Sequence, residues 1–268
     1  MYKGVNSWKH FLFEKAVVFG IVFCFVAGGF SPVVGNPDDT VFDRLPLGDG
    51  GRDGGWWNTS WAFRKQVSLN HSLVDGDLEN FPVLVSLASD SNLSADAQGD
   101  ADDLVFTDEV GTVLAHEIEF YDNTTGELIA WVNVSSLSST VNTSLYLYFG
   151  NPSCGNQENP AAVWDSDFVL VQHLSETSGT HYDSTSYDND GVPSGSPVMD
   201  AVGPVDGCDS FDGVDDKVTC GVSDLPTASG TVSLWARPDG GYSGPGAPDM
   251  IVLEMGSAGD DRQLLYFN

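Results

Sequence analysis

The stretch TSLYLYFGN, residues 143–151, has the pattern of a β-strand, because Leu145 and Leu147 alternate with Tyr146 and Tyr148. Five runs of the same kind precede it, rich in Val, Leu, Ile and aromatic residues and separated by turn sequences such as DGD, SDSN and NTTGE. No segment offers twelve residues of helical periodicity. Six short strands within about ninety residues predict a β-sandwich over residues 56–152.

β-like runs resume after a stretch rich in Gly, Asn and Pro, which predicts a linker over residues 153–162. The later runs are VWDSDFVLVQHL, DSFDGVDDKVTCG, GTVSLWARPD and DMIVLEMGS, and the chain ends in RQLLYFN. The sequence therefore predicts an all-β protein with two tandem β-sandwich domains. The second, residues 163–268, has few strands for a sandwich, and we expect it to be incomplete at its C-terminal end.

The N-terminus has the composition of an export signal. Lys3, Lys9 and Lys15 precede an apolar run of fifteen residues, 16–30. A membrane span needs about 20 apolar residues, so this run suits a signal segment over residues 1–36, followed by a linker over 37–55. The alternative is an uncleaved anchor, which would be the protein's contact with a membrane.

The charge of the chain excludes some partners. The formal net charge is −29, and beyond residue 36 only seven basic residues face 38 acidic ones. Nucleic acid and anionic membrane surfaces are therefore poor partners, because nothing neutralises their phosphates. Bound cations, or a salty medium that screens the repulsion between carboxylates, fit this balance better.

Six N-x-S/T sequons without proline support export, because such sites accept glycans in secreted proteins. Roughly two would be expected by chance, and a bulky sugar requires a surface position. We therefore expect glycans on several of these side chains, all of which should be exposed: Asn58, Asn70, Asn92, Asn123, Asn133 and Asn142.

The sequence does not decide whether its cysteines form a disulfide. Cys24 lies in the signal segment, Cys154 in the predicted linker, and Cys208 and Cys220 flank DSFDGVDDKVT. An exported protein can form the Cys208–Cys220 disulfide, which would stabilise it by roughly 3 kcal/mol. Strand alternation puts these two cysteines on opposite faces, however, so the bridge requires a bulge.

Two acidic stretches are candidates for a cation site: YDSTSYDNDGVPSG from Tyr182 and SFDGVDDKV from Ser210. Calcium takes six to eight oxygen ligands, and neither stretch has the spacing of an EF-hand, so a site would need both loops. The alternative is that Asp, Asn and Gly here form ordinary turns. The candidate calcium ligands are Asp183, Asp188, Asp190, Asp212, Asp215 and Asp216.

The segment HEIEFYD, from His116, contains a second carboxylate pattern. Glu117 and Glu119 lie on one face of the expected strand, with Cα atoms about 6.5 Å apart. That is near the separation of roughly 5 Å between the carboxyl groups of retaining glycosidases. The alternative, which we prefer, is a solvated strand face. No metal-binding or nucleophile motif is recognised elsewhere, and we assign no catalytic residue.

The first domain resembles the family called domain of unknown function 2341. The resemblance rests on WWNTSWAFRKQVSL, ENFPVLVSL, DDLVFTDE, HEIEFYD and TSLYLYFGNP, in that order, over Trp56 to Pro152. The family is typical of exported, multi-domain prokaryotic surface proteins and implies no activity.

The second domain is similar to the laminin-G-like, concanavalin A-like lectin/glucanase superfamily. The similarity rests on HLSE, DSTSYDNDG, FDGVDDKV and TVSLW. It implies a partial jelly roll that commonly binds calcium and a glycan or protein ligand. We therefore expect a secreted or cell-surface protein with a non-catalytic binding or adhesion role. The alternatives are a polysaccharide hydrolase or its accessory module, and a structural envelope component. The oligomeric state is left open.

The export signal gives the first prediction. Mass spectrometry of the native protein should find a mature N-terminus near Asn36, because the apolar run is too short to serve comfortably as a span. An intact N-terminus at Met1 would show the anchored form instead.

Overall fold

The computed structural model describes residues 9–10, 33–34, 42–44, 55–203, 205–212, 214–221, 233–236, 250–255 and 263–267. The predicted signal segment and the linker after it lie outside the described residues, apart from Gly55 and the short strands β1 (Lys9–His10), β2 (Val33–Val34) and β3 (Phe42–Arg44). Among the described residues, no helix is long and apolar enough to cross a bilayer.

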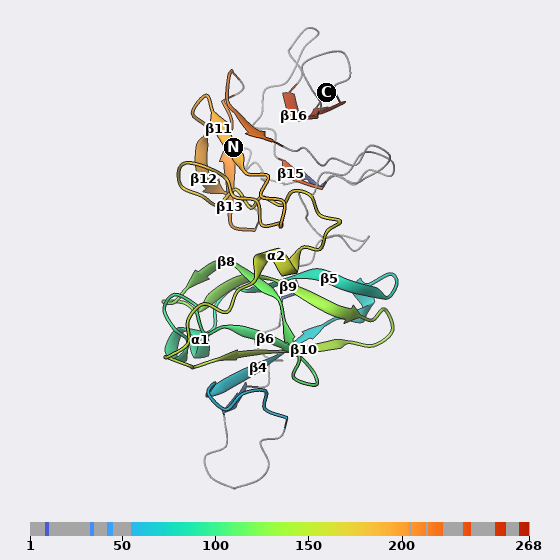
Figure 1. Cartoon of the computed structure of the whole chain (residues 1–268), viewed down its shortest axis with the longest axis vertical. Helices are drawn as coiled ribbons and strands as arrows, with labels where there is room; N and C mark the ends of the chain where they lie inside the picture. The colour runs from blue at the N-terminus through green and yellow to red at the C-terminus, as the bar shows by residue number, and fades with distance from the viewer. Residues whose placement is uncertain are drawn as a thin grey trace, which may run out of the picture.

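Two sheets form the lower body in Figure 1 and face each other as a sandwich. The five-stranded sheet has the order β3-β4-β10-β6-β7, with β4 (Phe63–Leu69), β10 (Thr143–Phe149), β6 (Val105–Asp108) and β7 (Val113–Leu114). The four-stranded sheet has the order β2-β5-β9-β8, with β5 (Leu78–Leu87), β9 (Glu127–Leu137) and β8 (His116–Asp122). The short helices η1 (His71–Leu73) and α1 (Ser91–Asp96) lie in the connections before and after β5. The predicted all-β fold is confirmed.

The alternation in β10 places its residues as predicted. Leu145, Leu147 and Phe149 are fully buried in the core between the sheets. Tyr148 lies on the opposite face and is also buried, because it packs with Trp56 and Trp61 in a second cluster outside the five-stranded sheet. The sandwich is therefore covered by aromatic residues on this outer face instead of being open to water.

The chain continues past the predicted linker without a break in packing. Helix α2 (Pro160–Val163) lies over the four-stranded sheet (Figure 1). The segment from Trp164 to Asp190 contains no strand longer than a single bridge, and Trp164 and Val171 pack against the outer face of that sheet. The segment after the sandwich therefore packs on the outer face of the four-stranded sheet, in a cluster separate from the core between the sheets.

Short strand pairs make up the described remainder of the chain. β11 (Gly191–Ser194) pairs with β14 (Lys217–Cys220), and β12 (Val198–Val202) pairs with β13 (Gly207–Ser210). β15 (Trp235–Ala236) pairs with β1, and β16 (Met250–Met255) with β17 (Gln263–Phe267). The predicted second sandwich stays a prediction, because the described strands beyond residue 190 form two-stranded pairs.

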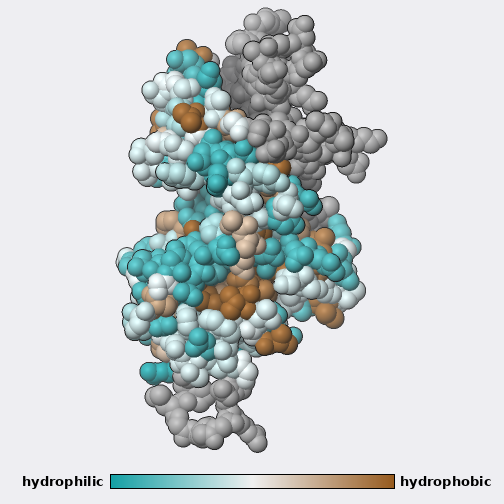
Figure 2. All heavy atoms as spheres, in the orientation of Figure 1, coloured by the Kyte–Doolittle hydropathy of each residue, from teal (hydrophilic) through white to brown (hydrophobic). Residues whose placement is uncertain are grey.

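Figure 2 shows hydrophilic residues over most of the drawn face, with hydrophobic colour gathered in a few patches. Single exposed valines, such as Val110 and Val141, are normal on such a surface. The main apolar surface of the sandwich lies between its sheets, so its stability depends on that core.

The core gives the second prediction. Leu145→Ala should lower the free energy of unfolding by about 2–5 kcal/mol, because the side chain is fully buried and its removal leaves a cavity. The matched control is Val110→Ala, since Val110 is 87% exposed and should change stability little. Chemical denaturation of both variants tests this, and equal losses would show that the core is misassigned.

Candidate functional site

Glu117 and Glu119 lie on the same outer face of the four-stranded sheet, as strand alternation predicts, and a β-bulge in β8 follows at Glu119. Glu117 lies opposite Trp131 and Ile118 opposite Ala130, but Ile129 lies opposite Phe120. Glu119 is therefore the extra residue of the bulge, and Phe120 after it also faces outward, against the cluster of Trp131. The expectation that this face is solvated is wrong, because the side chains of Glu117 and Glu119 are only 11% and 2% exposed.

A hydrophobic cover lies over these carboxylates. Trp164, from the end of α2, packs against Trp131 of β9 with ring centroids 5.3 Å apart. Both rings are almost fully buried. Trp131 is therefore a packing residue, and neither ring has a free face on which a sugar could stack.

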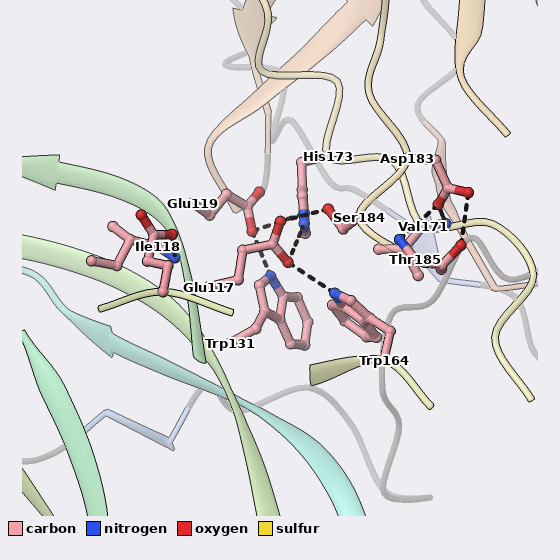
Figure 3. A network of polar contacts seen from close by, with 11 residues as sticks. Glu117, Ile118, Glu119, Trp131, Trp164, Val171, His173, Asp183, Ser184 and Thr185 are labelled. Carbon is pink, nitrogen blue, oxygen red and sulfur yellow. Dashed lines mark hydrogen bonds and ion pairs between the residues drawn. The ribbon is translucent and has the colours of Figure 1, made fainter. Parts of the chain in front are cut away.

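His173 lies between the two glutamates and completes the site, which we call the Glu–His–Glu cluster (Figure 3). Its Nε2 is 3.2 Å from Oε2 of Glu117, and its Nδ1 is 3.2 Å from Oε2 of Glu119. The indole N–H groups also donate, Trp131 to Glu119 at 2.6 Å and Trp164 to Glu117 at 2.8 Å. Every partner except Trp131 comes from the segment beyond the sandwich.

The electrostatics favour a charged histidine. Burial by itself lowers the pKa of His173, but the charges of Glu119 and Glu117 outweigh it, and the pKa rises well above its usual value. Burial raises the pKa of Glu117, but hydrogen bonds, first from His173 and then from Ser184 and Trp164, lower it overall. At neutral pH the cluster therefore holds an imidazolium between two groups that can compensate its charge.

Asp206 lies at the edge of the same cluster. It is half-buried, and the neighbouring Val205 packs against the Trp131–Trp164 pair. Burial, and then the charges of Glu119 and Asp200, raise the pKa of Asp206 to about 6, while His173 opposes the rise. Asp206 is thus a carboxyl group that carries a proton in mildly acidic solution.

A second buried histidine repeats the arrangement. His181 is fully buried, with Nδ1 2.7 Å from Oε2 of Glu176 and Nε2 2.8 Å from Oδ2 of Asp209. Burial lowers the pKa of His181, but hydrogen bonds and charges of Asp209 and Glu176 raise it to about 9. Asp209 belongs to β13, so this contact holds the β12–β13 pair against the segment before it.

The loop of Asp183 is organised internally. One carboxylate oxygen accepts from the backbone N–H groups of Val171 (2.8 Å) and Thr185 (3.0 Å). The other accepts from the Thr185 hydroxyl (2.7 Å) and the Asn189 N–H (2.9 Å). Asp190 in turn accepts from the N–H of Asp183. For Asp183 the turn interpretation is favoured, because four donors already use its lone pairs.

The six predicted calcium ligands are not brought together as one set. Gly191 lies opposite Cys220 and Ser194 opposite Lys217, so Asp190 and Asp216 flank opposite ends of the β11–β14 pair, about 16 Å apart along the strands. One loop does gather three carboxylates, with an oxygen of each within 4.8 Å of the others: Asp212, Asp215 and Asp216. Three carboxylates suit a divalent cation in part, and calcium binding stays a prediction. Asp188 is exposed.

The sequons lie at or near the surface, and glycosylation stays a prediction. Asn70, Asn123 and Asn142 are exposed, and Asn58, Asn92 and Asn133 are partly buried. At Asn133 the nitrogen that a glycan would join donates to the carbonyl groups of Ala162 and Val163, at 3.2 and 3.0 Å. A glycan there would disrupt the contact between β9 and α2.

The predicted Cys208–Cys220 disulfide also stays a prediction. Cys208 belongs to β13 and Cys220 to β14, and these strands pair with different partners. The thiol of Cys220 donates to Oε1 of Gln172 at 3.6 Å.

Comparison with known proteins gives one family. Residues 100–190, about a third of the chain, match the family model described as "Domain of unknown function (DUF2341)". The predicted resemblance is confirmed for this part. The match extends through residues 153–162 to Asp190, the same stretch that packs on the sandwich. No curated protein and no solved structure matches the chain. The laminin-G-like resemblance stays a prediction.

Reasoning from the sequence missed His173, His181 and their partners Glu176, Asp206 and Asp209. The signal present was the HLSE stretch, which contains His173 and Glu176. The strand pattern assigns that stretch to a separate second domain, and so predicts no contact with Glu117 and Glu119.

His181 gives the third prediction. A group whose pKa rises on folding stabilises the protein below its unfolded pKa and loses that effect as the pH passes its folded pKa. The contribution of His181, about 3 kcal/mol, should therefore be complete below about pH 6.5 and absent above about pH 9. The His181→Gln variant should lack most of the decrease in the free energy of unfolding that the wild type shows between pH 6.5 and 9, as measured by urea unfolding. His71→Gln, at a half-exposed site, is the control and should keep the wild-type pH profile.

Proposed function

We propose that this chain is an exported surface protein that binds a glycan or protein ligand without catalysis. In this proposal the sandwich is a rigid base, and the Glu–His–Glu cluster fixes the following β-region to it. The binding face belongs to the later strand pairs. The acid-rich composition, the sequons and the N-terminal apolar run support an extracellular location.

The observation that carries the non-catalytic role is the position of His173. Its imidazolium lies 3.2 Å from both glutamates, and the three side chains are at most 11% exposed. In a retaining glycosidase one carboxyl group must donate a proton to the substrate while the other attacks it. Here both carboxylates are occupied by donors of this chain, and the site is covered by Trp131 and Trp164.

One observation favours the alternative, a polysaccharide hydrolase. Burial, and then the charge of Glu119, raise the pKa of Asp206 to about 6, and a carboxyl group with a raised pKa is the usual general acid of such an enzyme. A hydrolase of this kind would need the cover over Glu119 to open. The third candidate, a structural envelope component, would neither bind glycans nor cleave them.

A glycan array combined with a reducing-end assay gives the fourth prediction. The wild-type chain should bind glycans on the array. It should release no reducing ends when it is incubated with polysaccharides that carry the glycans it binds. Asp206→Asn should bind as the wild type does, and Asp206 would be the general acid only if this variant lost a wild-type hydrolytic activity.

The glycan array is repeated with calcium and with a chelator, and a matched control variant is included. Loss of binding in a chelator, and in the double variant Asp212→Asn and Asp215→Asn, would support the predicted calcium site. Asp77→Asn, at an exposed site on the sandwich, is the control and should bind as the wild type does. A chain that neither binds nor cleaves would overturn the proposal in favour of the structural role.

A further inference from the structure

A buried lysine faces a buried aspartate inside the sandwich. Lys65 of β4 points to the same side as Val67 and Leu69, into the core. Its side chain is 6% exposed, and that of Asp90, just after β5, is 8% exposed. The Nζ of Lys65 is in contact with Oδ2 of Asp90. Lys65 belongs to the five-stranded sheet, and Asp90 caps α1 in the connection that follows β5 of the four-stranded sheet.

The position of this lysine is unusual for the chain. Beyond residue 15 the only lysines in the sequence are Lys65 and Lys217, and Lys217 is exposed. A buried ion pair contributes little to stability, because removing two charges from water costs about as much as their attraction returns. Burial also lowers the pKa of Lys65 to about 8, so an appreciable fraction of its amine is neutral near neutral pH. A neutral amine is a nucleophile.

The two oxygens of Asp90 have different surroundings. Oδ1 accepts hydrogen bonds from the backbone N–H groups of Asn92 (2.9 Å) and Leu93 (3.1 Å). Oδ2 faces the amine of Lys65. Two N–H donors fixed on one oxygen stabilise the negative charge that develops there when a nucleophile attacks the carbonyl carbon. The remaining oxygen is then placed to leave.

We propose that Lys65 and Asp90 form an intramolecular amide bond that joins β4 to the connection between β5 and α1. A proton passes within the ion pair, giving a neutral amine and a carboxylic acid. The Nζ of Lys65 attacks Cγ of Asp90, and Oδ1 bears the negative charge under the two N–H groups. Oδ2 receives the amine's proton and leaves as water. One N–C bond forms, one C–O bond breaks, and no oxidant or cofactor is needed.

This bond would act as a permanent link between β4 and the connection that follows β5. It closes the loop between residues 65 and 90, which includes η1 and β5. A cross-link of this kind restricts the unfolded chain as a disulfide does, but reducing agents do not break it. It goes beyond the proposed function, and its test does not depend on finding a ligand.

The test is a peptide map of the full chain, produced in a host that adds no glycans. Glu79 lies between Lys65 and Asp90, so a glutamate-specific protease places them on different peptides unless an amide joins them. We expect one branched peptide, lighter than the sum of the two by one water molecule, with fragments that locate the bond to Lys65 and Asp90. Lys65→Arg should abolish this peptide, and the matched control Lys217→Arg should retain it.

The wild-type map decides the proposal even if a variant fails to fold. Two separate, unmodified peptides from folded wild-type protein would show that Lys65 and Asp90 form only an ion pair, and would overturn the proposal. A branched peptide whose bond lies at another carboxylate would overturn it equally.

Discussion

The contact of the His173 imidazolium with Glu117 and Glu119 is the interaction on which the packing of the later segment against the sandwich depends. Two carboxylates on the outer face of a sheet would repel each other and would normally remain in water. The imidazolium removes that repulsion, and the indoles of Trp131 and Trp164 then bury the charged group under an apolar cover. His173 lies beyond the sandwich in the sequence. The contact that compensates the charges of Glu117 and Glu119 therefore also attaches the segment of residues 164–190 to the sheet.

The excess of acid explains why histidines have this role. Only seven basic residues follow residue 36, so most buried carboxylates need partners other than arginine or lysine. His173 and His181 each bridge two carboxylates, and backbone N–H groups serve others. Asp103, fully buried, accepts from the N–H groups of Gln98, Gly150 and Asn151. Backbone donors cost no side-chain entropy to hold in place, which suits a chain with so few cations.

The buried interior does not end where the strand pattern of the sandwich ends. Trp164 and Val171 belong to the same hydrophobic cluster as Trp131, and Asn133 of β9 donates to the backbone of α2. The family match, which runs to Asp190, includes this covering segment. The segment after the sandwich therefore packs on it directly, within the stretch that the family match covers.

The sequence by itself determined the all-β class, the strand positions of the sandwich and the alternation in β10, because the opposite directions of Leu145 and Tyr146 are a local property of the backbone. For Asp183 it left a calcium ligand and an ordinary turn as alternatives, and the hydrogen bonds of the structure favour the turn. Only the tertiary structure decided the state of Glu117 and Glu119, since Trp164 and His173, which bury and neutralise them, lie about forty-five to fifty-five positions further along. The same holds for Lys65 and Asp90. Local spacing cannot reveal such partners, because the meeting of two side chains distant in sequence depends on how whole sheets and segments pack.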